Sequence, residues 1–346
     1  MTPAFDWGND RAVKSASLDE INNALGNIVG ASSLKNMTKK LMQVSVSVSD
    51  HFVGRKETID LVLASLVSGV PMVLMGEPGL AKSAIVNKIV EVCGGSRNEG
   101  EYFEYLLTSH TMPENIFGPP DLKELREGNI HTNTAGMLPK ASVAFLDEVF
   151  RGSPHILNTL LSVINERKFF NGKDTDKVPL IGVIGASNDL TSNPELDAFV
   201  DRFPVRHWMK SVMMSSGDKA VQLMKKSLAA NNGTGSEDGA LSFSLNHLRA
   251  CRIYVDRVAA DQVNKDEFNT YSDAFCRMKQ QFTLSDRSFS AIFRMGCAYD
   301  IVRYGELKGM GPTELLKHVA RDSDGAKRSM ELIEKLMPSG GVGGTV

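Results

Sequence analysis

The eight residues GEPGLAKS, from Gly76 to Ser83, place two glycines before a Lys-Ser pair. When such a loop opens a helix, its main-chain N–H groups and the helix N-terminus can surround a phosphate group. In that geometry Lys82 would reach the β- and γ-phosphates of a nucleotide, and the hydroxyl of Ser83 would bind Mg²⁺. The usual pattern is G-x-x-x-x-G-K-[ST], and Ala81 takes the place of its second glycine. We expect Ala81 to enter the first helical turn with negative φ, where alanine is well tolerated.

The segments on either side of this loop favour phosphate binding over an ordinary strand–turn–helix corner. VPMVLM before it is typical of a buried strand, and SAIVNKIVEVCGG after it predicts a helix that ends at a glycine. Strand before and helix after is the context that a phosphate loop requires. We therefore predict that nucleotide is bound by the loop residues Gly76, Glu77, Pro78, Gly79, Leu80, Ala81, Lys82 and Ser83.

A pair of acidic residues, Asp147 and Glu148, ends the apolar strand pattern SVAFLDEVF. Hydrolysis needs such a second element, because a phosphate loop alone activates no water. Asp147 would hold Mg²⁺, usually through water, and Glu148 would act as the general base. Two acids at a strand end are otherwise commonly a solvated edge. Beside a phosphate loop, the catalytic interpretation is favoured.

Three further polar residues are candidates, each with a plain alternative. Asn188 follows the strand pattern PLIGVIGAS and could orient a water beside a γ-phosphate, although asparagine there also suits a simple turn. Arg202, in DRF, lies so far past the predicted strands that it suits a neighbouring subunit better than its own nucleotide. Arg287, in SDRSF, is expected near the start of a helix, where single arginines are usually solvated charges.

The elements that must position these residues alternate along the chain. From about residue 58, helix patterns alternate with strand patterns, which predicts a mostly parallel sheet covered by helices on both faces. Before it, Leu18, Ile21, Leu25 and Ile28 suit one amphipathic helix, and SVSVS at 45–49 alternates as a strand does. We predict an N-terminal extension, an α/β core, a helical domain with a linker near 229–240, and a flexible tail. Their bounds are 1–50, 51–212, 213–336 and 337–346.

The composition is typical of a globular protein and excludes some classes of function. The net charge is -2 and the pI about 6.4, so there is no chain-wide basic surface for nucleic acid. The chain has no apolar run of the roughly 20 residues that span a bilayer, and its first residues lack a signal-peptide pattern. Four scattered cysteines predict buried, reduced thiols. We therefore expect a cytoplasmic protein.

This ordered set of motifs resembles the AAA+ ATPases and, within them, the MoxR family, most closely its RavA branch. The resemblance covers about residues 50–300 and is carried by GEPGLAKS, FGPPDLKEL, LPKASVAFLDEVFRGSPHILNTLLSVINERKFFNG, GASNDL, DRF and SDRS. It implies an α/β P-loop domain, with a parallel sheet sandwiched by helices, followed by an α-helical lid domain. Alanine before the P-loop lysine is common in that family.

The resemblance implies ATP and Mg²⁺ as cofactors and gives the first candidates their roles. Residues 76–83 would form the Walker A loop, Asp147 and Glu148 the Walker B pair, and Asn188 the sensor 1 residue. Val53, in HFVGR, lies in a segment that resembles the one near adenine.

The arginines take their roles from the same resemblance. Arg202 would be the arginine finger, with Arg206 as the next candidate, and Arg287 would be the sensor 2 residue. One departure stands out, because the family often has asparagine or lysine shortly after the Walker B acids. Here VFRG leaves Arg151, which could contact the neighbouring protomer.

The resemblance also implies an assembly. Members usually form a hexameric ring with nucleotide at each subunit interface, and commonly work with a von Willebrand A domain protein to remodel or activate other protein complexes. Two insertions are expected, one from FGPP to LPK above or in the pore, and a hairpin in FFNGKDTDKVP. Asn171-Gly172 predicts the two-residue turn of that hairpin.

Other functions remain open from the sequence. The motor subunit of a metal chelatase belongs to a neighbouring group with the same insertions. A scaffold that assembles on ATP with little turnover is a second alternative, although it would not need Glu148, Asn188 and Arg202. A nucleic-acid motor is disfavoured, because there is no stripe of basic and aromatic residues.

Overall fold

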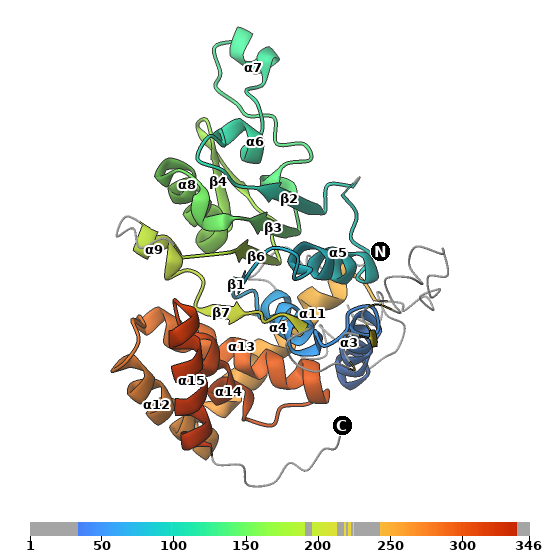
Figure 1. The fold of residues 1–346 in the computed structure, drawn as a ribbon. Helices are drawn as coiled ribbons and strands as arrows, with labels where there is room; N and C mark the ends of the chain where they lie inside the picture. The colour runs from blue at the N-terminus through green and yellow to red at the C-terminus, as the bar shows by residue number, and fades with distance from the viewer. Residues whose placement is uncertain are drawn as a thin grey trace.

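The computed structural model of the protein describes residues 34–97, 99–190, 196–212 and 243–337, with a few isolated positions between 213 and 242. The helix predicted around residues 18–28, the linker near 229–240 and the tail from residue 338 lie outside the described residues. A central sheet separates two layers of helices, and the C-terminal helices gather on one side of it (Figure 1).

The central sheet has five parallel strands in the order β2-β3-β6-β1-β7. Their bounds are β1 Met72–Met75, β2 Tyr102–Leu106, β3 Val143–Asp147, β6 Gly182–Ser187 and β7 Val205–Trp208. Strands β1 and β6 are buried along their whole length, as expected for parallel strands that are covered on both faces. The predicted α/β class and parallel sheet are confirmed.

Two hydrophobic cores lie on opposite faces of the sheet, because successive side chains of a strand point to opposite sides. Met72 and Leu74 of β1 belong to one core, whereas Val73 and Met75 belong to the other. The helices of the α/β part are α3 Leu34–Ser49, α4 Lys56–Ser68, α5 Lys82–Val92, α8 Pro154–Glu166 and α9 Asp197–Val200. The first three of these cover the first core, and α8 and α9 cover the second.

Helix α3 corrects one prediction, because it runs through the SVSVS stretch that alternates as a strand does. Met37, Leu41, Val44 and Val48 of α3 are all buried, each at most 1% exposed. Their spacing is that of one helix face, which lies on the core. The apolar period of the whole segment therefore outweighs the alternation of five residues.

The C-terminal part is helical, as predicted, and packs against the sheet-covering helices. Its helices are α11 Leu245–Gln262, α12 Asp266–Lys279, α13 Asp286–Tyr304, α14 Gly311–Leu315 and α15 Ser323–Leu336, with the 3₁₀ turn η5 Leu316–His318. Helix α13 passes so close to α14 that a Cβ at Gly296 would lie 2.2 Å from the Cα of Pro312. Among the described helices, none is long and apolar enough to cross a membrane.

Two insertions project together from the second face of the sheet (Figure 1). The first holds α6 Pro113–Phe117, α7 Leu122–Arg126 and η1 Leu138–Lys140, and the second is the hairpin of β4 Lys168–Asn171 and β5 Asp174–Lys177. The stacked rings of Phe117 and Phe169, 5.4 Å apart, join them near their base. The side-chain oxygen of Asn171 also accepts the N–H of Thr132 at 2.7 Å. The two insertions therefore form one packed unit.

The hairpin turn lies one residue later than predicted. Asn171 is the last residue of β4 and pairs with Asp174, so the two-residue loop is Gly172-Lys173. Gly172 has φ 63°, as the first central position of a type II′ turn requires. Asn171 is 5% exposed, and its side chain forms hydrogen bonds with the backbone N–H and C=O of Thr132. These hydrogen bonds explain why Asn171 stays in the strand and does not enter the turn.

The cysteines agree with the prediction of buried thiols at three of four positions. Cys93, Cys251 and Cys297 are buried, and burial raises the pKa of each thiol to about 12. Cys276 is exposed, which is a correction. It lies on α12 between the buried Phe275 and Arg277 on the outward face, so its neighbours in sequence did not reveal its exposure.

Candidate nucleotide site

The carboxyl ends of three neighbouring strands meet at one edge of the sheet. Met75, the last residue of β1, pairs with Ser187, the last residue of β6. On the other side of β6 lies β3, which ends at Asp147. Because the strands are parallel, the predicted loop after β1, the acids after β3 and Asn188 after β6 all emerge at this edge. This is where open α/β sheets bind ligands.

The backbone of the loop between β1 and α5 adopts three positive φ angles. Gly76 has φ 141°, and a Cβ there would lie 2.9 Å from the carbonyl oxygen of Met209. Gly79 has φ 82°. Ala81 has φ 64° and ψ 29°, in the left-handed region, which contradicts the negative φ predicted for it. An L-residue there costs about 1–2 kcal/mol, so the strain explains why the usual pattern has glycine at this position.

Helix α5 presents its N-terminus to the loop without a side-chain cap. Ala81 is its N-cap residue and has no side chain that can accept a hydrogen bond. The first backbone N–H groups of a helix need acceptors and carry a partial positive charge. At α5 these N–H groups can donate hydrogen bonds to a bound anion. Ser83 lies partly exposed in the same first turn.

Lys82 is the buried cation of this site, with 9% of its surface exposed. Its Nζ donates to the carbonyl oxygen of Gly76 at 2.6 Å and to Oδ1 of Asn188 at 2.8 Å. Burial lowers the pKa of Lys82, and the nearby charges of Asp147 and Glu148 oppose that shift. The ammonium group is thus surrounded by neutral oxygens, with two carboxylates farther away.

Asn188 connects Lys82 to Glu148. Its Oδ1 accepts from Lys82, and its Nδ2 donates to Oε1 of Glu148 at 2.7 Å. The other carboxylate oxygen of Glu148 lies 3.3 Å from Nε of Arg151, an ion pair within one chain that the sequence did not predict. Three of the predicted residues, together with Arg151, therefore form a continuous line of contacts.

The acidic pair owes its orientation to the turn after β3. Glu148 has φ 48° and ψ 42°, a left-handed conformation that ends the extended course of β3. Its N–H donates to Oδ1 of Asp147 at 2.9 Å. The 3₁₀ turn η2, Val149–Arg151, follows at once and places Arg151 beside Glu148.

Arg202 and Arg287 come together at a different place, between α9 and the start of α13. Nη1 of Arg202 lies 3.3 Å from Asp201, which also accepts the hydroxyl of Ser285 at 3.0 Å. Burial lowers the pKa of Arg202, and so does the positive charge of Arg287, while Asp201 raises it. In the described part of the chain, the buried Nε of Arg202 has no hydrogen-bond partner.

Comparison with known proteins identifies the family. Residues 39–250, well over half of the chain, match the family described as the MoxR domain in the MoxR-vWA-beta-propeller ternary systems. The chain belongs to the MoxR family of AAA+ proteins. Its fold is similar to the crystal structure of a Cytophaga hutchinsonii protein proposed to be an ATPase. That similarity has a TM-score of 0.64 at 15% identity, over 89% of this chain and 96% of that one.

Curated relatives of this MoxR domain are longer proteins. Two uncharacterized proteins of Methanocaldococcus jannaschii, MJ0079 and MJ0812, are 39% and 41% identical over 56% and 50% of this chain. The structural protein ORF618 of Acidianus two-tailed virus is 32% identical over 68% of the chain. The MoxR domain spans 49%, 45% and 38% of these three relatives, so it covers about half of their length or less.

Arg206, the second candidate for an arginine finger, is excluded by its position in this MoxR domain. It is 2% exposed, and its Nη1 and Nη2 donate to the carbonyl oxygens of Val319 and Val200 at 2.6 and 3.1 Å. Burial lowers its pKa to about 10. A side chain that joins β7 to the helical part and to α9 cannot reach a neighbouring subunit.

Val53 lies in a segment that is connected to the phosphate loop by contacts of neighbouring residues. Val53 is 8% exposed and lies two residues before Arg55. Nη1 of Arg55 donates to the carbonyl oxygen of Lys210 at 2.8 Å. The adjacent Met209 is the residue whose carbonyl lies against Gly76. The segment predicted to lie near adenine is thus fixed beside the start of the phosphate loop.

The residues at the sheet edge fit a nucleotide with Mg²⁺. The uncapped start of α5 and the ammonium group of Lys82 supply donors for phosphate oxygens. Ser83 and Asp147 supply the oxygen ligands that Mg²⁺ prefers, from the first turn of α5 and the end of β3. In the described part of the chain there is no cluster of three His, Cys, Asp or Glu that would hold a metal unaided. A cation held by two side chains and the phosphates needs no such cluster.

Proposed function

We propose that this MoxR domain binds ATP with Mg²⁺ and hydrolyses it. The observation that carries the proposal is the line of contacts from Lys82 through Asn188 to Glu148, beside the uncapped N-terminus of α5. These contacts bring an ammonium group and a carboxylate to either side of one amide. Phosphoryl transfer from a nucleotide to water uses both, a cation on the phosphates and a base or positioning group for the water.

In the proposed reaction, Glu148 takes a proton from the water that attacks the γ-phosphorus, and ADP leaves with the electrons of the broken P–O bond. Bound Mg²⁺ would neutralise charge on the phosphate oxygens. In the structure both carboxylate oxygens of Glu148 have partners, Asn188 and Arg151. We infer that catalysis requires at least one of these contacts to open, so that the base can accept the water.

We propose that Arg202 and Arg287 act on the nucleotide of a neighbouring subunit in a ring, which we expect to be a hexamer. Neither side chain makes a hydrogen bond or ion pair with the loop of residues 76–83 in the described part of the chain. Because Arg287 is close enough to lower the pKa of Arg202, we infer that the two side chains serve the same nucleotide. Two neighbouring cations suit an anion placed between subunits.

We also propose a von Willebrand A domain protein as a partner and a protein complex as the client. The family description, which names ternary systems with a vWA and a β-propeller component, supports this. Grouping with the RavA branch and a cytoplasmic location remain proposals from the sequence. The alternative of a chelatase motor differs from the proposed function in its client. The alternative of a scaffold differs from it in having little turnover.

The first experiment compares two site variants with a matched control. Lys82→Ala removes the cation and should abolish binding of a fluorescent ATP analogue. Glu148→Gln keeps the shape of the side chain but removes the base, so ATP should bind while turnover falls by roughly 10² or more. Glu91→Gln makes the same chemical change at an exposed position of α5 and should keep both properties. A Glu148→Gln protein that hydrolyses ATP at the parental rate would refute Glu148 as the base.

A further inference from the structure

Arg202 belongs to a short segment that contacts the helical part of the same chain. Helix α9 ends at Val200, and Asp201 and Arg202 follow it directly. Oδ2 of Asp201 accepts the hydroxyl of Ser285 at 3.0 Å and lies 3.3 Å from Nη1 of Arg202. Ser285 is the N-cap of α13, and Arg287 lies in the first turn of that helix. The position of Arg202 is therefore linked to a contact between the α/β part and the helical part.

Arg206 connects the end of α9 to the helical part from inside the protein. It lies on β7, which Figure 1 shows between α9 and the C-terminal helices. Its Nη1 donates to the carbonyl oxygen of Val319, just after η5, at 2.6 Å, and its Nη2 donates to that of Val200 at 3.1 Å. The same carbonyl of Val200 accepts the N–H of Phe203 at 3.0 Å. The guanidinium group thus bridges two backbone segments, one of which leads directly into Arg202.

The residue type at this position favours accurate placement of the two segments. Arg206 is 2% exposed, and burial lowers its pKa to about 10. A buried cation loses its hydration, so an apolar side chain would fill the same space at less cost. Arginine differs from an apolar residue, and also from lysine, in a planar fork that reaches two acceptors in fixed directions. The bridge between two carbonyl groups uses that fork.

Two further contacts join the same segments. Nε1 of Trp208, also on β7, donates to the carbonyl oxygen of Ala320 at 3.3 Å. Nη1 of Arg321 lies 2.6 Å from Oδ1 of Asp197, the first residue of α9. The consecutive residues 319–321 therefore contact β7 or α9 in turn, and α9 is held to the helical part at its first and its last residue.

We propose that Arg206 is a positioning residue for Arg202, because it fixes the end of α9 to the helical part and so sets the direction of the Arg202 side chain. This inference rests on the proposed role of Arg202 at the nucleotide of a neighbouring subunit. Since the bridge runs to the helical part, the helical part of each subunit controls the arginine that its neighbour receives. Arg206 acts through the backbone of Val200, so its replacement leaves the phosphate loop of its own chain intact.

The first test measures ATP binding and turnover in Arg206→Met and Arg206→Lys. Methionine keeps an unbranched stem without a donor, and lysine keeps the charge on one nitrogen, which lacks the fork for both carbonyl groups. Each variant should bind fluorescent ATP within about threefold of the parent, while kcat falls about 10- to 100-fold because Arg202 is misplaced. Arg328→Met, at an exposed position of α15, is the control and should keep both properties. Parental kcat in either Arg206 variant, or an equal loss of ATP affinity, overturns the proposal.

A second measurement follows α9 itself, without nucleotide. Hydrogen–deuterium exchange, read by mass spectrometry, should become faster in peptides that cover residues 197–204 of Arg206→Met and Arg206→Lys, because α9 loses its bridge to Val319. Peptides that cover the phosphate loop, residues 76–83, should exchange as in the parent. Faster exchange in both regions would give Arg206 a general role in folding and overturn the proposal, as would unchanged exchange in α9.

The closing test asks whether Arg206 acts on the neighbour's nucleotide. Arg206→Met keeps Lys82, and Lys82→Ala keeps Arg202 and Arg206, so some interfaces of a mixed assembly contain the whole set. This mixture should hydrolyse ATP faster than the sum of its two components. The reference is the mixture of Arg202→Ala with Lys82→Ala. If the reference recovers activity and the Arg206→Met mixture does not, Arg206 acts within its own subunit and this inference fails alone. If neither mixture recovers activity, the role of Arg202 at the neighbouring nucleotide fails, and the inference fails with it.

Discussion

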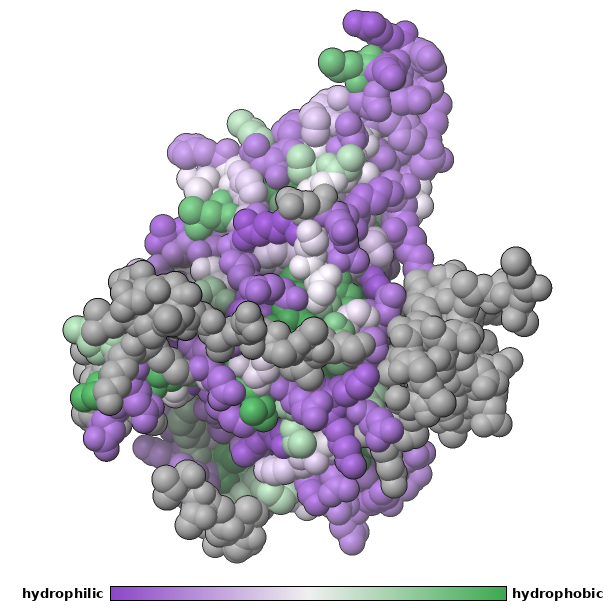
Figure 2. Space-filling view, turned by 90° about the vertical axis from the view of Figure 1, so that its right-hand side faces the viewer, coloured by the Kyte–Doolittle hydropathy of each residue, from purple (hydrophilic) through white to green (hydrophobic). Residues whose placement is uncertain are grey.

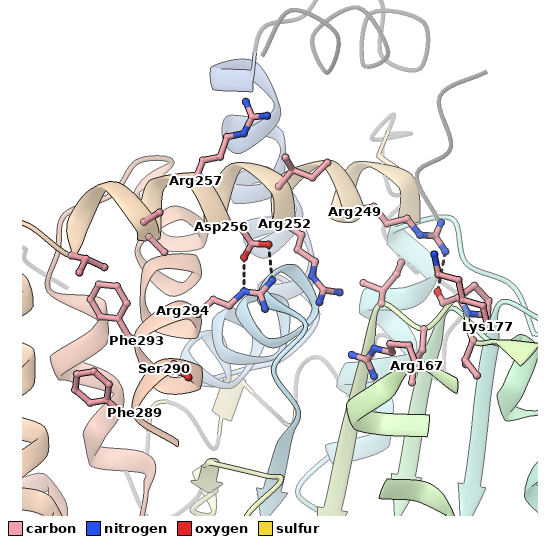
Figure 3. A pocket seen from close by; sticks show the side chains of 18 of the residues that line it. Arg167, Lys177, Arg249, Arg252, Asp256, Arg257, Phe289, Ser290, Phe293 and Arg294 are labelled. Carbon is pink, nitrogen blue, oxygen red and sulfur yellow. Dashed lines mark hydrogen bonds and ion pairs between the residues drawn. The ribbon is translucent and has the colours of Figure 1, made fainter. Parts of the chain in front are cut away.

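Charged side chains from neighbouring elements lie near both ends of strand β6, but the contacts that they make differ. At the carboxyl end, the ammonium of Lys82 and the carboxylate of Glu148 are joined by one amide, and Arg151 completes the line. At the amino end, positive side chains line a cavity whose single described carboxylate is engaged by Arg294. The first group is one continuous line of contacts, whereas the second gathers side chains from elements that are far apart in the sequence (Figure 3).

This difference indicates different tasks for the two ends. A balanced set of contacts must be opened before it can act, so a ligand there competes with existing hydrogen bonds and can control the timing of a reaction. At the amino end, Arg249 of α11 donates to Ser142 and to the carbonyl of Pro179, so this side chain joins the helical part to the α/β part. The face of the molecule that Figure 2 shows is largely hydrophilic, with apolar residues scattered among the polar ones.

The largest expected effect concerns the arginine that lies outside the balanced line. Arg202→Ala should bind ATP almost normally but lose about 10³–10⁵ in turnover, because an arginine finger stabilises charge on the transferred phosphoryl group. Arg328→Ala, an exposed arginine on α15, is the control and should be unchanged. The measurement is steady-state ATP hydrolysis together with a fluorescent-ATP titration.

Mixing experiments show which subunit Arg202 serves. Arg202→Ala and Lys82→Ala proteins, each inactive alone, should regain part of the activity when mixed, since some interfaces then combine an intact Lys82 with an intact Arg202. An arginine that acts within its own chain permits no such recovery. Full activity of Arg202→Ala by itself would remove this residue from the mechanism.

A smaller effect is expected at the centre of the balanced line. Asn188→Ala breaks both the contact with Lys82 and the contact with Glu148, so we expect turnover to fall by about 10²-fold, the usual effect of removing one preorganised donor. The affinity for ATP should change much less. If turnover stays within a factor of three of the parent, the line of contacts does not contribute to the reaction.

A third cluster shows what burial does to the charge of two neighbouring histidines. His207 and His318 are buried with their Nδ1 atoms 3.5 Å apart, between β7 and η5. Burial lowers the pKa of His207 to about 3 and also lowers that of His318. Glu57, whose pKa is well below its usual range, lies 3.6 Å from Nε2 of His318, and Lys317 lies 2.6 Å from Glu57.

These histidines predict acid lability between the α/β part and the helical part. Their folded pKa values lie below the unfolded value of about 6.5, so below that pH the unfolded chain takes up protons that the folded chain does not. Stability should fall from pH 6.5 to pH 5, by up to about 1.4 kcal/mol per pH unit for each histidine. Glu57 adds to this loss only below about pH 4.5. Thermal melting of the parent and of His318→Gln across this range tests the prediction: the variant should show a shallower slope.

Sequence patterns predict the fold, because the period of each strand and helix is a local property of the chain, and the parallel sheet then brings the loop, the two acids and Asn188 to one edge. The period of strands and helices identifies the sheet, and the loop of residues 76–83 stands next to the strand and helix that orient it. The Glu148–Arg151 contact was missed because an exposed arginine after the acids has no distinctive pattern. Arg206 was the next candidate for an arginine finger, but it lies on β7 between two helical layers and is buried.

The cavity at the amino end of β6 could not be predicted in this way. Its cationic residues are spread from position 167 to position 294, and each of them alone resembles an ordinary surface charge. They come together only because α11 and α13 of the helical part fold back beside the hairpin. The residues of the nucleotide site are also distant in sequence, but each group of them follows a strand of the same parallel sheet, which the sequence pattern predicts.

The smallest expected effect tests the strain within the phosphate loop. Ala81 has φ 64°, where an L-residue costs about 1–2 kcal/mol, and glycine would remove that cost but adds about 0.5–1 kcal/mol of chain entropy to folding. Ala81→Gly should therefore stabilise the protein by roughly 0.5–1 kcal/mol and raise Tm by about 1–2 °C. Ala84→Gly, three residues later at an exposed position of α5, is the matched control. It should destabilise by about 1 kcal/mol, because its backbone is helical. Differential scanning calorimetry of the two variants gives shifts of opposite sign if the loop is strained as the structure shows. A loss of stability in both would mean that Ala81 has a negative φ in solution.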